Sequence, residues 1–105
     1  MQDLCLIVSI VRRGWGDTVL NVTMNAGAPG GTVLLGRGVG RSEKLRFFGI
    51  QIEPEKEVVL TIAPVSLKTA LLEEIRKTAD LDAPAHGLAF VVPIDSIIGA
   101  EHLVA

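Results

Sequence analysis

Glycine occupies every second position of the stretch GRGVGR, residues 36–41 of this chain of 105 residues, and two arginines follow glycines there. Glycine permits positive φ and close approach of the backbone, so the N–H groups of Gly38 and Gly40 could converge on a phosphate, with Arg37 and Arg41 supplying charge. The same residues also suit a loop that only has to turn, and the helix that completes a P-loop or a dinucleotide fingerprint is missing. Taken alone, the stretch favours the simple loop.

Other residues that could do chemistry give weaker patterns. Asp80, Asp82 and His86 lie close in the sequence, but no second histidine or cysteine stands at a ligand spacing, so we expect no metal site. Cys5 lies in the apolar run LCLIVSIV, which predicts a buried thiol rather than a nucleophile. No serine stands in a nucleophile elbow. We therefore expect that the protein is not an enzyme.

Charge and hydropathy narrow the classes of partner. Ten Lys and Arg residues against twelve Asp and Glu give a formal net charge of -2, which disfavours binding to nucleic acid or to an anionic membrane. No apolar stretch approaches the roughly 18 residues that span a bilayer, so we expect no membrane insertion. The single cysteine and the lack of a basic, apolar leader favour a reducing compartment, and we expect the cytoplasm.

Apolar periodicity predicts four strands and two helices. The strands are expected at residues 4–11, 32–35, 58–65 and 88–94. The first helix is expected after Asp17 as N-cap, with Gly27 as its stop, and the second is expected to begin at Ser66 as cap and to end at residues 78–81.

The order β-α-β-β-α-β predicts a ferredoxin-like α+β fold, an antiparallel sheet with two helices on one face, in a single domain spanning residues 1–105. The first and third strands are the most continuously apolar and should be central. Because the helices cover one face only, apolar residues on the other face favour a homo-oligomer. The connection over residues 36–57 is long for a hairpin. We expect its Phe47 and Phe48 to pack on the sheet or between subunits rather than to anchor a partner.

Three motifs, in this order and at these separations, resemble the PII signal-transduction proteins, the nitrogen regulators. They are GGTVLLGRGVGRSE at residues 30–43, EKEVVLTIAP at residues 55–64, and HGLAFVVPID at residues 86–95. The first looks like the second strand and the start of the family's T-loop, and the last is similar to its phosphate-binding B-loop and last core strand. The resemblance extends over nearly the whole chain.

The resemblance implies a ferredoxin-like homotrimer that binds adenine nucleotides, ATP, ADP or AMP, in clefts between subunits. Such proteins regulate a target enzyme, transporter or transcription regulator through the T-loop, which corresponds to residues 41–56 here, and the B-loop corresponds to residues 82–87. Carried over residue by residue, the adenine pocket would be lined by Thr32 and Ile62. The phosphates would lie beside Gly38, Gly40 and Arg41, and they would face Gly87.

Several residues depart from the family's pattern. Leu88 stands where the family usually has a lysine, the tail IIGAEHLVA lacks the expected arginine pair, and the chain has no tyrosine for uridylylation. Fewer charge-assisted contacts favour a weaker or less phosphorylated ligand. Two alternatives therefore remain open: a trimeric interaction scaffold that has lost nucleotide binding, and a small enzyme or metal-binding trimer of the same architecture.

Overall fold

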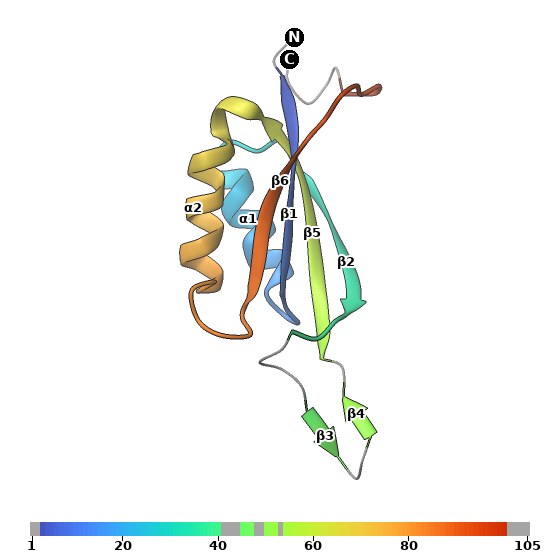
Figure 1. The fold of residues 1–105 in the computed structure, drawn as a ribbon. Coiled ribbons are helices and arrows are strands. Elements are labelled where there is room, and N and C mark those ends of the chain that lie inside the picture. Colours follow the sequence, from blue (N-terminus) through green and yellow to red (C-terminus); the bar gives the residue numbers. More distant parts are fainter. Residues whose placement is uncertain (1–2, 41–44, 48–49, 53, 101–105) are drawn as a thin grey trace.

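A computed structural model describes residues 3–40, 45–47, 50–52 and 54–100 (Figure 1). Its elements, in chain order, are β1 (Leu4–Arg12), α1 (Gly16–Asn25), β2 (Gly31–Arg37), β3 (Leu45–Phe47), β4 (Ile50–Ile52), β5 (Glu55–Pro64), a short 3₁₀ helix (Val65–Leu67), α2 (Lys68–Ala79) and β6 (Gly87–Pro93). All four predicted strands and both predicted helices are present, so the ferredoxin-like α+β fold is confirmed.

The main sheet has the strand order β2-β5-β1-β6, and every neighbouring pair is antiparallel. The central position of β1 and β5 is thus confirmed. Both helices lie on the same side of this sheet, as Figure 1 shows. Alternate residues of each strand face the helices, and those of β1 and β5 are almost completely buried. The buried apolar core consists of Cys5, Ile7, Val11, Val19, Ala28, Val59, Ala63, Leu71, Ile75 and Ala79.

The predicted N-cap of α1 is wrong. The helix begins at Gly16, its cap position is Trp15, and Asp17 lies within the first turn. No side chain caps the helix locally. Instead the carboxylate of Glu57, on β5, accepts hydrogen bonds from the backbone N–H groups of Gly14 and Gly16. Glu57, on a distant strand, thus caps the N-terminus of α1 in place of the local Asp17 that was predicted to cap it.

The predicted cap of α2 is also wrong. Ser66 lies inside the 3₁₀ helix that follows β5, and the cap position of α2 is Leu67, with no side-chain hydrogen bond. The chain tightens into a 3₁₀ turn as it leaves the strand, which delays the α-helix by one residue. The helix then ends as predicted, at Asp80, which adopts a left-handed conformation with φ 52°.

The long connection between β2 and β5 contains the antiparallel pair β3 and β4, in which Leu45 lies opposite Ile52. Figure 1 shows this hairpin extending beyond one end of the main sheet. The main strands are longer than predicted, and the segment 41–56 therefore overlaps the first two residues of β5, Glu55 and Lys56. The predicted packing of Phe47 and Phe48 concerns side chains outside the described part of the structure.

Candidate functional site

The sheet face away from the helices is apolar and uncovered by any described residue of this chain. The register places its members side by side on four strands, and we call them the open face: Leu6, Val8, Ile10, Leu34, Val58, Leu60, Ile62, Leu88, Phe90 and Val92. The helix-covered face is not purely apolar either, because β1 and β5 place Ser9 and Thr61 there. An apolar sheet face left in water calls for a cover.

One cavity lies at the end of the open face where β2 begins. It measures about 310 Å³ and is lined by Leu6, Pro29, Gly30, Gly31, Thr32, Leu60 and Ile62. We call it the Thr32 pocket. The structure brings together Thr32 and Ile62, the two residues expected beside an adenine, in surroundings that suit the flat apolar faces of a base.

A second cavity, the Lys56 pocket, lies at the other end of the open face, beside the base of the hairpin. It measures about 220 Å³ and is lined by Ile10, Gly38, Val39, Gly40, Lys56, Gly87 and Leu88. The glycines expected beside phosphates are thus together, although Gly38 and Gly40 precede Gly87 by some fifty residues. Arg41 lies outside the described residues.

Gly87 of the Lys56 pocket lies tightly against the neighbouring strand β1. Its φ is +122°, and a Cβ placed on it would overlap the carbonyl oxygen of Ile10 on the neighbouring strand. No other amino acid fits without moving the backbone. Within the predicted B-loop, residues 82–86 form the loop, while Gly87 is already the first residue of β6. His86 Nδ1 lies 3.1 Å from the carbonyl oxygen of Asp80, to which it can donate a hydrogen bond across this loop.

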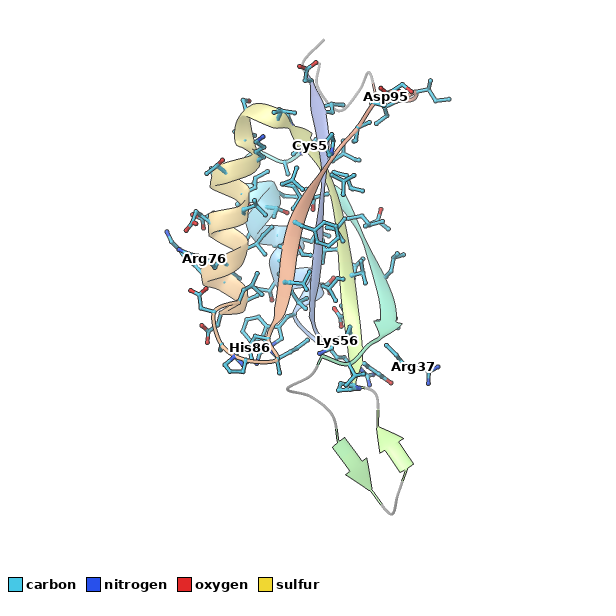
Figure 2. The ribbon with its side chains drawn as sticks, in the orientation of Figure 1. Cys5, Arg37, Lys56, Arg76, His86 and Asp95 are labelled. Carbon is cyan, nitrogen blue, oxygen red and sulfur yellow. The ribbon has the colours of Figure 1, made fainter. Side chains whose placement is uncertain are left out.

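Sequence reasoning missed Lys56 as a residue of this site. Its side chain is only 6% exposed, and it lines the pocket with the glycines. Figure 2 shows it at the same end of the sheet as Arg37 and His86. The strand was predicted to begin only at Val58, which left Lys56 in the long connection. If the strand is extended back, the alternation of Lys56, Val58 and Leu60 places the lysine on the open face.

The turn between β1 and α1 lies beside the same end of β5. The guanidinium carbon of Arg12 lies 4.8 Å from the centre of the Trp15 ring, and Arg13 forms an exposed ion pair with Glu55. Glu57 binds the N–H of Gly14 at 2.7 Å and that of Gly16 at 2.8 Å. The start of β5 is therefore fixed to this turn by two carboxylates.

Cys5 is buried, as predicted, at 1% exposure in the core. Burial raises the pKa of its thiol, and the nearby Lys68 opposes this shift in part. A thiol held neutral and away from solvent is not a nucleophile. In the described part of the chain, no three His, Cys, Asp or Glu residues gather as metal ligands would.

Among the described residues, no helix has both the length and the apolar character needed to cross a membrane. No family model matches the chain. No curated protein matches it in sequence either.

The chain resembles solved structures in its fold. The crystal structure of a Bacillus cereus protein related to NIF3 has a similar fold, with a TM-score of 0.68 and 18% sequence identity. The likeness covers 90% of this chain but only 26% of that protein, so this chain corresponds to about a quarter of it. At this identity the likeness concerns the fold alone, and it agrees with the ferredoxin-like assignment.

Proposed function

We propose that this chain is a PII-like regulatory protein, not an enzyme, that binds an adenine nucleotide between the subunits of a homotrimer. The observation that carries the proposal is the pair of pockets on the open face. One is apolar and holds Thr32 and Ile62. The other holds Lys56 and the glycines at positions 38, 40 and 87. These are the two halves that a nucleotide requires, one for the base and one for the phosphates.

The spacing of the two pockets supports a site between subunits. Lys56 and Ile62 are on the same strand and six residues apart, a separation of about 20 Å along β5. One small ligand does not contact both within a single chain. If copies of the chain cover each other's open faces, the Thr32 pocket of one subunit can meet the Lys56 pocket of the next. The uncovered apolar face supplies the driving force for that assembly.

The charge of the Lys56 pocket favours a nucleotide with few phosphates. Lys56 is a buried residue of this pocket, and its ammonium group would act as a point charge for a phosphate. Leu88 lines the same pocket at the position where a second cation was expected. Arg41 follows Gly40 directly and is proposed as a further phosphate contact. We therefore propose ADP or AMP, rather than ATP, as the effector.

The hairpin is the proposed signalling arm. Gly38 and Gly40, which precede the hairpin, line the Lys56 pocket together with Lys56, which follows it, and the N–H of Gly38 donates a hydrogen bond to the carbonyl oxygen of Pro54 at 3.2 Å. A phosphate bound at Gly38 and Gly40 would therefore act on the base of the hairpin. The hairpin would present the resulting conformation to a target enzyme, transporter or regulator.

Isothermal titration calorimetry with AMP, ADP and ATP tests the proposal. We expect ADP and AMP to bind at least as tightly as ATP, and Lys56→Met to weaken binding about tenfold, as expected for the loss of one charge-assisted hydrogen bond. Lys77→Met, which removes the same charge from the last turn of α2, is the matched control and should bind like the parent. Absence of binding by the parent protein to all three nucleotides would refute the proposed ligand.

A trimeric interaction scaffold without a nucleotide is the second candidate, and Leu88 favours it. If the parent forms an oligomer but binds none of the three nucleotides, this candidate takes precedence. Binding that depends on Lys56 excludes it.

A further inference from the structure

We infer that Glu57 is a positioning residue for Lys56: its carboxylate fixes the start of β5 to the turn between β1 and α1 and so holds the ammonium group at the Lys56 pocket. This role rests on the proposed function, because it concerns the same anion site. Neighbouring side chains of a strand point to opposite faces, so Glu57 lies on the helix side of β5 and Lys56 on the open side.

The contacts of Glu57 are those of a clamp. Its two carboxylate oxygens accept separate hydrogen bonds, one from Gly14 at 2.7 Å and one from Gly16 at 2.8 Å. The N–H of Gly16 is one of those that the first turn of α1 leaves without a helical partner, and the N–H of Gly14 belongs to the turn just before the helix. Hydrogen bonds to a charged acceptor at a helix N-terminus are stronger than neutral ones. The clamp therefore joins parts of the chain that lie 41 and 43 residues apart.

The turn has the residues that such a clamp needs. Gly14 has a φ of +92°, which few side chains tolerate, and a Cβ on Gly16 would overlap a carboxylate oxygen of Glu57. The carboxylate thus occupies the space that any larger residue at position 16 would take. The glycines of the segment RRGWG have a specific partner in Glu57.

Lys56 lies at the centre of the segment that this clamp immobilises. On one side Glu55 pairs with Arg13 of the same turn, and on the other Glu57 binds its backbone. The lysine itself pairs in register with Arg12 on β1 and with Gly36 on β2. The backbone at Lys56 is thus held between both neighbouring strands as well as by the turn.

Electrostatics and positioning predict opposite effects for the loss of the Glu57 charge. Glu57 is an anion next to an anion site, so neutralising it should tighten binding if charge alone matters. If its role is to hold Lys56 in place, neutralising it should weaken binding, because the hydrogen bonds to Gly14 and Gly16 become weaker. The sign of the change therefore distinguishes the two roles.

The experiment measures ADP binding by calorimetry for the full-length parent protein and for Glu57→Gln, Lys56→Met and the double variant. We expect Glu57→Gln to weaken ADP binding about three- to tenfold in the parent background and to change it less than twofold in the Lys56→Met background. Glu73→Gln, on α2, removes the same charge from an exposed ion pair with Arg76 and is the control, with unchanged binding expected.

Trp15, the only tryptophan of the chain, reports on the turn itself. Its emission should change in Glu57→Gln and stay unchanged in Glu73→Gln. Equal or tighter ADP binding by Glu57→Gln overturns the positioning role and leaves the proposed function intact. An equal loss of ADP affinity in the parent and in the Lys56→Met background also overturns the positioning role, because the effect of Glu57→Gln then does not act through Lys56. If the parent binds no nucleotide, the proposed function fails, and this role fails with it.

Discussion

Both faces of the main sheet are largely apolar, but the two helices cover only one of them (Figure 1). The face toward α1 and α2 contains the hydroxyls of Ser9 and Thr61, both fully buried and without a hydrogen-bond partner among the described residues. The open face is also apolar, yet Phe90 there is 43% exposed. This sheet therefore has two apolar faces, and the described residues of the chain cover one of them.

β1 carries a matched pair for testing this difference, and the largest effect is expected on the covered face. Ile7 is 0% exposed and packs in the core beneath the helices. Ile7→Ala should lower the free energy of unfolding by about 3 to 4 kcal/mol, because it removes buried apolar surface and leaves a cavity. Chemical denaturation measures this loss. A loss below about 1 kcal/mol would mean that the covered face is not the core.

Ile10, the same residue type three positions later, is the other half of the pair. It is half-buried on the open face. In dilute protein Ile10→Ala should cost only about 1 kcal/mol, because less apolar surface returns to water. If copies of the chain cover this face, the loss should grow as the protein concentration is raised. Denaturation at several concentrations, with sedimentation for the oligomeric state, measures this. A constant loss in a monomer would argue against the proposed trimer.

The smallest effect concerns the pH dependence of the covered face. The pKa of Cys5 is raised above 9.0 in the folded protein, so the unfolded chain releases the thiol proton first as pH increases. The associated stability is complete below pH 9.0 and is lost as pH rises through the folded pKa. The parent should therefore lose stability more steeply above pH 9 than Cys5→Ala does. The free energy of unfolding is measured by chemical denaturation at a series of pH values. If it falls equally steeply with pH in the parent and in Cys5→Ala, water reaches this thiol.

The fold was predictable from the sequence because its strongest signals are local. The runs LCLIVSIV and VVLTIAPV are continuously apolar, and this pattern identified the two central strands of the sheet. The starts of both helices were not predictable. Glu57 reaches α1 from a strand some forty residues away, and no local pattern of capping residues contains that information.

The candidate site was predictable in part, for a related reason. The glycines at 38, 40 and 87 could be identified as candidates from their residue type, and they line one pocket. Lys56 could not be identified in this way, because a lysine between two glutamates is typical of a solvated surface. The separation of Thr32 and Ile62 from these glycines became visible only from the strand register, which sets the two pockets at opposite ends of one face.

The adjacent positions 87 and 88 differ in the substitutions that they accept. At position 87 the carbonyl of Ile10 leaves no space for a side chain, so redesign has no choice there. At position 88 the side chain is 53% exposed at the rim of the same pocket, and the backbone accepts any residue that suits a strand. Ligand preference can therefore be altered at position 88 while its neighbour keeps the scaffold fixed.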